Sequence, residues 1–142
     1  MKRRQQAKII SRSALAELRV AAMEAAKRAY CPYSRFPVGA AVLTADGRIF
    51  SGCNVENASY GLTICAERNA IFQAVAGGSK EILAVMIYTS TPYPTTPCGA
   101  CRQVINEFGP KAEIYSSSNR KRELHLSMTA LLKHAFGPQD LV

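Results

Sequence analysis

The chain has 142 residues, the length of one compact domain, and its 48% of hydrophobic residues is enough to build a buried core. Its net charge is +8, and no apolar run approaches the ~18 residues that a membrane span requires, so we expect no membrane association. An odd number of cysteines (five) and the lack of a secretory signal argue against a disulfide framework. They favour a cytoplasmic protein that uses thiols for metal binding or catalysis.

Basic residues are concentrated at the N-terminus, where Lys2, Arg3, Arg4, Lys8 and Arg12 lie in the first twelve positions. No aromatic side chains are interleaved to stack on bases, so a solvated, flexible arm over residues 1–12 is favoured over a nucleic-acid-binding arm. We expect residues 13–142 to form a single domain.

The first predicted element is an amphipathic helix over residues 13–29, in which apolar residues recur at three- and four-residue steps. Ser11 and Ser13 are candidate N-caps. Cys31-Pro32 should end the helix, because proline disfavours helical geometry in the residue before it.

The later elements alternate between strands and helices, which predicts an α/β fold with parallel strand pairing and helices that cover the sheet. In chain order we expect strands Val38–Thr44 and Arg48–Cys53 around an Asp46-Gly47 turn, a loop over 54–63, a helix Cys65–Ala76 capped by Thr63 and ended by Gly77-Gly78, a strand Ile82–Thr89, a proline-rich loop Thr91–Pro97, a helix Cys98–Phe108, strands Glu113–Ser117 and Glu123–Leu126, and a helix Met128–Ala135 capped by Ser127.

Three cysteines have the spacing of a catalytic metal site. Cys98 and Cys101 are three residues apart at the start of a predicted helix, so both sulfurs can reach one ion, and Cys65 begins another helix. Three thiolates leave one zinc position for water, which is typical of catalytic rather than structural zinc. We therefore predict one Zn²⁺ on Cys65, Cys98 and Cys101.

Glu67 lies two residues after Cys65 and is the candidate proton carrier. The two side chains can approach one ion only if Cys65 lies at the lip of its helix. Three thiolates and Zn²⁺ sum to −1, so a positive environment is needed for bound water to ionise near neutral pH. Two helix N-termini and Arg68, as a hydrogen-bond donor to the thiolates, can supply it.

Several motifs together resemble the small zinc-dependent cytidine deaminases, over about Ala29 to Leu141. They are Cys65-Ala66-Glu67-Arg68, Pro97-Cys98-Gly99-Ala100-Cys101-Arg102-Gln103, Phe36-Pro37-Val38-Gly39-Ala40, Gly52-Cys53-Asn54-Val55-Glu56-Asn57 and the tail Phe136-Gly137-Pro138-Gln139-Asp140-Leu141. Departures from the family pattern, Lys133 after Leu131-Leu132 and the proline-rich loop, concern the rim of the site and the interface rather than the metal ligands.

The resemblance implies a three-layer α/β/α fold around a five-stranded mixed sheet, and a homotetramer whose active sites are shared between subunits. It implies hydrolytic deamination of free cytidine and 2′-deoxycytidine in pyrimidine salvage, in which zinc-bound hydroxide attacks C4 and Glu67 shuttles protons. It also implies roles for single residues: Asn54 and Glu56 at the ribose 3′-OH, Phe36 against the nucleoside, the Ala66 N–H at the base carbonyl, and Tyr60 and Phe136 at a neighbouring subunit's site.

Other functions are compatible with the same metal-binding residues. A deaminase of single-stranded nucleic acid would explain the +8 charge, but the Glu56 carboxylate would repel a phosphate, so free nucleoside fits better and no nucleic-acid partner is expected. A deaminase of a cytosine-containing antibiotic such as blasticidin need not keep Asn54 and Glu56. A non-catalytic, RNA-binding zinc module, or a four-cysteine site completed by Cys31 or Cys53, would require a fourth protein ligand.

Overall fold

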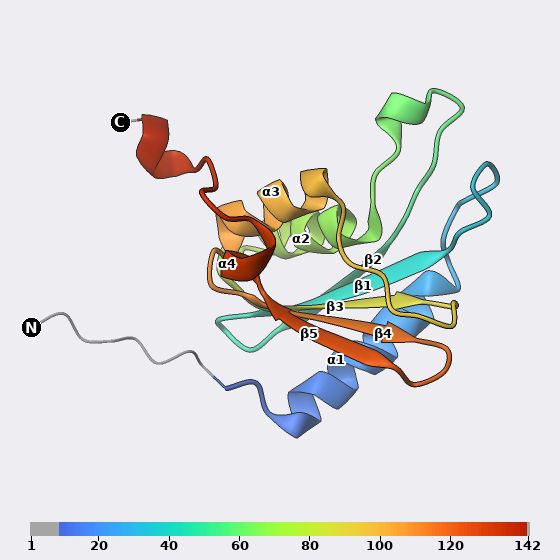
Figure 1. The fold of residues 1–142 in the computed structure, drawn as a ribbon, viewed down its shortest axis with the longest axis horizontal. Coiled ribbons are helices and arrows are strands. Elements are labelled where there is room, and N and C mark those ends of the chain that lie inside the picture. The colour runs from blue at the N-terminus through green and yellow to red at the C-terminus, as the bar shows by residue number, and fades with distance from the viewer. Residues whose placement is uncertain (1–8, 142) are drawn as a thin grey trace, which may run out of the picture.

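The computed structural model describes residues 9–141 of the chain, and its centre is a five-stranded sheet with the strand order β2-β1-β3-β4-β5 (Figure 1). Its elements in chain order are α1 Arg12–Ala26, β1 Val38–Thr44, β2 Ile49–Cys53, the 3₁₀ helix η1 Tyr60–Leu62, α2 Ala66–Ala76, β3 Ile82–Thr89, α3 Gly99–Phe108, β4 Glu113–Ser118, β5 Glu123–Ser127, α4 Met128–Leu131 and the 3₁₀ helix η2 Pro138–Leu141.

The sheet is mixed, as predicted. The β1 strand pairs antiparallel with β2 and with β3, β3 pairs parallel with β4, and β4 pairs antiparallel with β5. The one parallel pair is the one whose strands are connected through α3, because a helical crossover returns the chain in the same direction. The predicted strands Val38–Thr44 and Ile82–Thr89 have the observed bounds.

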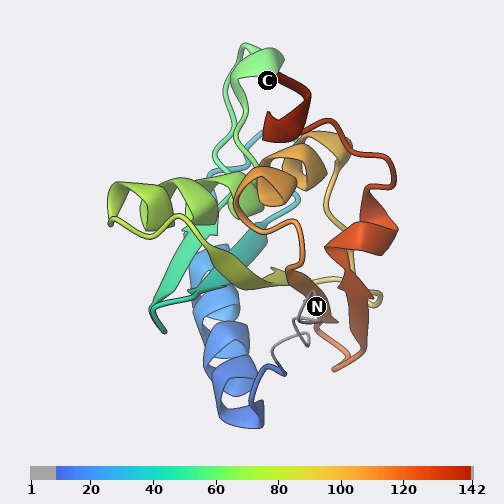
Figure 2. The same ribbon diagram turned by 90° about the vertical axis from the view of Figure 1, so that its left-hand side faces the viewer.

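Helices cover both faces of the sheet, which gives the three layers (Figure 2). On one face, Leu18 and Ala22 of α1 pack in a buried cluster with Ala41 and Met86. On the other face, α2, α3 and α4 contribute to a larger cluster: Ala40, Val42, Ala66, Ala70, Ile71, Ala74, Ile82, Val85, Ile87, Ile105, Ala112, Ile114 and Met128. Alternate residues of β1 and β3 enter opposite clusters, because successive strand side chains point to opposite faces.

Two glycines allow the helices to approach the sheet closely. A Cβ at Gly39 of β1 would lie 1.9 Å from the Ala22 carbonyl oxygen of α1, and a Cβ at Gly52 of β2 would lie 2.5 Å from the Ala70 nitrogen of α2. Any larger residue would push the helices away. The second contact holds the N-terminal half of α2, which carries part of the site described below, against the end of β2.

Helix α1 is shorter than the predicted span 13–29. It begins after the N-cap Ser11 and ends at Ala26. Beyond it the chain is drawn into pairing with the segment after β2: Tyr30 N donates to the Asn54 carbonyl, and Glu56 N donates to the Tyr30 carbonyl. The backbone groups of residue 30 are therefore satisfied across the molecule rather than along a helix.

Two further details of the prediction are wrong. Thr63 does not cap α2, because it lies two residues before the N-cap Cys65 and ends η1 instead. The last helix reaches Leu131, not residue 135, because the backbone leaves helical geometry at Leu132 and takes a positive φ at His134. Ser127 caps this helix as predicted and accepts a bond from Ala130 N.

Four cations of the predicted basic arm, Lys2, Arg3, Arg4 and Lys8, lie outside the described residues. The last residue of that arm, Arg12, is the first residue of α1. Within residues 9–141, no helix combines the length and the apolar character that a bilayer crossing demands.

Candidate functional site

Three cysteine sulfurs meet where the N-termini of α2 and α3 lie side by side. The Sγ atoms of Cys65, Cys98 and Cys101 all lie within 4.8 Å of one another, and Cys65 Sγ is 3.9 Å from Cys98 Sγ. Cys65 is the N-cap of α2, Cys98 is the N-cap of α3, and Cys101 lies in the first turn of α3. The predicted position of Cys65 at the lip of its helix is therefore confirmed.

The sulfur group fits a zinc ion. With Zn–S bonds of ~2.3 Å, two ligands of a tetrahedral site lie about 3.8 Å apart, close to the observed Cys65–Cys98 separation. Among the described residues, no other His, Cys, Asp or Glu joins these three sulfurs, and Cys31 and Cys53 stay apart from them. The donor set therefore offers three ligands rather than four, which argues against a closed structural site.

Positive charge surrounds the sulfurs. The partial charges of two helix N-termini lie beside them, and Arg68 Nη2 donates to Cys65 Sγ over 3.4 Å. Cys101 and Arg68, which both lie beside Cys65, lower the pKa of the Cys65 thiol to about 5. The pKa of Cys101 is raised, because the neighbouring Cys65, its own burial and the Glu67 carboxyl favour the protonated thiol.

Glu67 is almost completely buried beside the sulfurs. Its side chain extends from the first turn of α2, and its Oε2 accepts a hydrogen bond of 3.1 Å from the Cys101 thiol. Burial raises the pKa of Glu67 above that of an exposed carboxyl group. A carboxyl with a raised pKa can both take up and release a proton near neutral pH, as general acid–base catalysis needs.

A cavity of about 390 Å³ opens next to Glu67 and two of the sulfurs. It brings together most of the predicted site residues, but Tyr60 and Phe136 do not line it and are largely exposed. The residues that line the cavity are Ser34, Phe36, Val38, Asn54, Glu56, Thr63, Cys65, Ala66, Glu67, Thr95, Thr96 and Cys98.

Asn54 and Glu56 hold the cavity wall that contains Phe36. The buried Asn54 side chain accepts from Val38 N and donates to the Phe36 carbonyl, both over 2.9 Å. Glu56 accepts from the backbone N–H groups of Tyr33 and Ser34 and from the Ser34 hydroxyl. These bonds, above all that of the Ser34 hydroxyl, lower the pKa of Glu56, so this carboxyl is ionised at neutral pH.

Several residues that line the cavity were not predicted from the sequence. Ser34 donates to Glu56 and accepts from Phe36 N at 3.1 Å, although no spacing pattern singles it out. Thr95 and Thr96 form another wall, and only their place directly before Pro97-Cys98 could have indicated this. Neither His125 nor His134 belongs to the sulfur group, and His125 pairs with Glu113.

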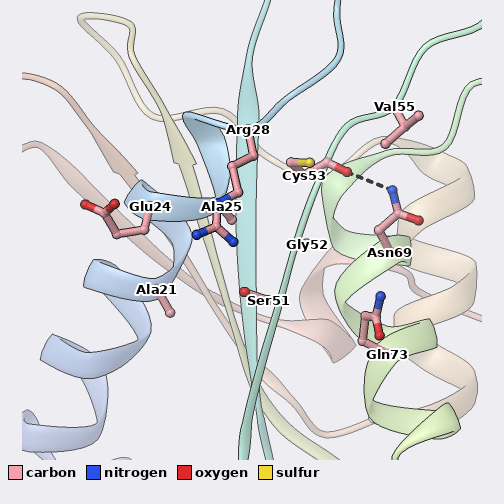
Figure 3. A pocket seen from close by; sticks show the side chains of 10 residues that line it. All are labelled: Ala21, Glu24, Ala25, Arg28, Ser51, Gly52, Cys53, Val55, Asn69 and Gln73. Carbon is pink, nitrogen blue, oxygen red and sulfur yellow. Dashed lines mark hydrogen bonds between the residues drawn. The ribbon is translucent and has the colours of Figure 1, made fainter.

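A larger cavity, of about 530 Å³, lies between α1, β2 and α2 (Figure 3). Its walls include Glu24 of α1, Arg28 just beyond the end of this helix, and Asn69 and Gln73 of α2, and Asn69 donates to the Cys53 carbonyl over 2.7 Å. This cavity contains neither the three clustered sulfurs nor Glu67. The smaller cavity is therefore the candidate functional site.

Comparisons with known proteins agree with this geometry. Residues 13–117 match the family model described as "cytidine and deoxycytidylate deaminase zinc-binding region". The chain is 46% identical to a cytidine deaminase of Sporosarcina psychrophila, over 83% of this chain and 88% of the relative. It is 45% identical to a cytidine deaminase of Mycobacterium tuberculosis, over 87% of this chain and 90% of the relative. A crystal structure of cytidine deaminase from Burkholderia pseudomallei superposes with a TM-score of 0.81 at 46% identity, covering 89% of this chain and all of the other.

We expect a Cys98→Ser variant to lose most of its zinc, because a serine hydroxyl is a poor substitute for a soft thiolate. The matched control is Cys53→Ser, which changes a thiol outside the sulfur group. Elemental analysis after dialysis measures the metal directly. The wild type and the control should hold about one Zn²⁺ per chain and Cys98→Ser far less; equal zinc in all three would contradict the ligand set.

Proposed function

The chain belongs to the cytidine and deoxycytidylate deaminase family, and on that premise we propose that it hydrolyses free cytidine and 2′-deoxycytidine. The reaction consumes one water molecule, breaks the bond between C4 and the amino nitrogen, and yields uridine or 2′-deoxyuridine and ammonia. One observation carries the proposal: the sulfur group and the buried Glu67 lie at a cavity that also exposes Asn54, Glu56 and Phe36.

Cys65, Cys98 and Cys101 would hold the zinc ion. Bound there, Zn²⁺ supplies a Lewis acid that lowers the pKa of a water molecule. Because three thiolates weaken that effect, the positive charge around them becomes part of the chemistry. Arg68, which donates to Cys65, offsets one unit of negative charge and holds this thiolate in place.

Glu67 is the proton shuttle of the proposed reaction. It takes a proton from the attacking water, delivers it to N3 of the pyrimidine ring, and then assists the departure of the amino group as ammonia. Its burial supports both halves of this role, because burial raises the pKa of this carboxyl and so makes it a better proton acceptor than an exposed one.

The remaining lining residues fit a nucleoside. The Ala66 N–H lies in the first turn of α2, where backbone N–H groups have no acceptor within the helix, and is offered to the base carbonyl. Phe36 packs against the nucleoside, while Asn54 and Glu56 bind the ribose 3′-OH. Asn54 and Glu56 already bond to the chain, but carboxylate and amide oxygens keep further lone pairs for a ligand.

The charge of Glu56 favours a free nucleoside over nucleic acid. Its lowered pKa keeps it ionised, and in a polynucleotide the ribose 3′ oxygen carries a phosphate. Two negative charges in contact within a partly dry cavity repel each other strongly. The same carboxylate would have no partner in a substrate without ribose, such as a cytosine-containing antibiotic with another sugar.

We also propose a homotetramer in which Tyr60 and Phe136 complete the sites of neighbouring subunits. Tyr60 is 73% exposed and Phe136 58% exposed, and Leu62 adds a third exposed apolar side chain near Tyr60. Phe136 lies on a C-terminal segment that extends away from the sheet (Figure 1). Large exposed apolar groups mark interaction surfaces when they cluster.

The proposed setting is pyrimidine salvage in the cytoplasm, with residues 13–142 as the catalytic domain. All five cysteines are free, and three thiol ligands require a reducing compartment. The residues that line the candidate site fall between Ser34 and Cys98, well inside this range.

For Glu67→Gln we expect zinc to be retained while kcat falls by about 10²–10⁴-fold, because glutamine cannot carry a proton between water and the ring. Steady-state ammonia release and zinc content should be measured on one preparation. Turnover close to that of the wild type would remove Glu67 from the mechanism.

Replacing Glu56 by Gln should raise the KM for cytidine by roughly 10–100-fold, since a hydrogen bond to a charged group contributes about 1.5–3 kcal/mol. The variant should also tolerate 3′-substituted cytidines better than the wild type. An oligonucleotide that contains cytosine serves as the second substrate. Deamination of the oligonucleotide by the wild type at a rate like that of cytidine would overturn the assignment to free nucleosides.

In a tetramer with shared sites, Phe136→Ala should raise the KM by about 2–10-fold, the effect of one lost aromatic contact. Val20→Ala, which truncates an apolar side chain of α1 that is 61% exposed, is the control and should change nothing. Sedimentation equilibrium gives the mass of each protein. A fully active monomer would exclude the shared site.

A further inference from the structure

Arg102 makes three hydrogen bonds that no part of the proposed chemistry uses. It lies on α3 directly after Cys101, and its guanidinium reaches two separate segments. Toward the proline-rich loop Thr91–Pro97, Nε donates to the Pro97 carbonyl over 2.8 Å and Nη2 donates to the Thr96 hydroxyl over 3.3 Å. Toward the C-terminal segment, Nη1 donates to the Leu131 carbonyl over 3.1 Å.

The first pair of bonds acts on a metal ligand. The Pro97 carbonyl and the Cys98 nitrogen belong to one planar peptide unit, so a fixed carbonyl also fixes the positions of the Cys98 nitrogen and Cα. The Thr96 hydroxyl belongs to the wall of the cavity, next to Cys98. The planar guanidinium of Arg102 thus holds both Thr96, which lines the cavity, and the peptide group that precedes the metal ligand Cys98.

The third bond acts on the segment that carries Phe136. Leu131 is the last residue of α4, and the chain beyond it leads to Phe136 without further regular structure before Pro138. The next residue of α3, Gln103, donates from Nε2 to the Phe136 carbonyl over 2.9 Å. Three consecutive residues of α3 therefore have different partners. Cys101 belongs to the sulfur group, and Arg102 bonds both to residues 96–97 and to the C-terminal segment. Gln103 bonds to the C-terminal segment alone.

None of the three acceptors of Arg102 is a carboxylate, so these bonds position the chain rather than neutralise an acid. The task suits arginine, whose guanidinium presents donors in a rigid plane and can serve several acceptors at once. Lysine offers a single nitrogen on a flexible stem and could not span the same oxygens.

We propose that Arg102 is a positioning residue that sets the geometry of Cys98 and the path of the Phe136 segment together. The proposal rests on the proposed function, in which Cys98 binds the metal and Phe136 completes a neighbouring site. It makes α3 a rigid link between the metal centre of one subunit and the aromatic residue offered to another.

The test uses full-length protein loaded with Co²⁺, whose absorption bands report ligand geometry, and hydrogen exchange of residues 132–141. The variants are Arg102→Gln and Arg102→Lys, and the matched control is Gln103→Met on the same helix. We expect both Arg102 variants to show shifted cobalt bands, metal affinity about 10–100-fold weaker and faster exchange in the C-terminal segment. Gln103→Met should speed exchange in that segment and leave the cobalt bands unchanged.

Cobalt bands like those of the wild type in the Arg102 variants would overturn the proposal. A lower melting temperature of these variants would not rescue it, because the loss of any purely structural residue lowers the melting temperature. If Arg102→Gln does not fold, Arg102→Lys decides alone, since it keeps the charge and one donor nitrogen. Shifted bands in Gln103→Met as well would show a general effect of α3 and also refute the specific role. Failure of the wild type to bind Co²⁺ through thiolates or to release ammonia would instead refute the proposed function.

Discussion

Three cysteine sulfurs held within 4.8 Å of one another make the strongest electrostatic demand on this fold. A bound metal would require all three to ionise, and positive charge that faces them offsets the repulsion between the resulting thiolates. The fold meets this requirement by placing two helix N-termini together and by adding the Arg68 guanidinium at Cys65. Both helices pack on the same face of the sheet, so the positions of their N-termini follow from the core.

The shape of the candidate cavity depends on side chains that bond to the protein backbone and, in our proposal, also to the ligand. Asn54 and Glu56 use their bonds to shape residues 33–38, and both still face the cavity. Such groups are oriented before any ligand arrives, so binding need not order them. The Ser34 hydroxyl, which joins Glu56 to Phe36 N, belongs to the same network.

The third helix connects the site to the surface. Its first turn carries Cys101, and the next two residues, Arg102 and Gln103, bond to the proline-rich loop and to the C-terminal segment. In the proposed tetramer, a segment held in this way presents Phe136 to another subunit in a defined position, although the side chain itself is exposed. The sulfur group and the segment that carries Phe136 are thereby connected through one helix.

Much of this could be predicted from the sequence. The i, i+3 spacing of Cys98 and Cys101 and the helix start at Cys65 are local properties, so the sequence could predict these three residues as ligands, while the packing of α2 and α3 brings their sulfurs together. The strands β1 and β3 have the predicted bounds, since their uninterrupted apolar runs reflect burial on both faces.

Tertiary structure alone decided the rest. Helix α1 ends early because Tyr30 pairs with residues beyond β2, and Thr63 does not cap α2 because it closes a 3₁₀ turn. The place of Ser34, Thr95 and Thr96 in the cavity, and the bonds of Arg102, follow from contacts between segments distant along the chain. Periodicity and capping describe neighbours within a few residues, and hydrogen bonds across the sheet lie beyond their range.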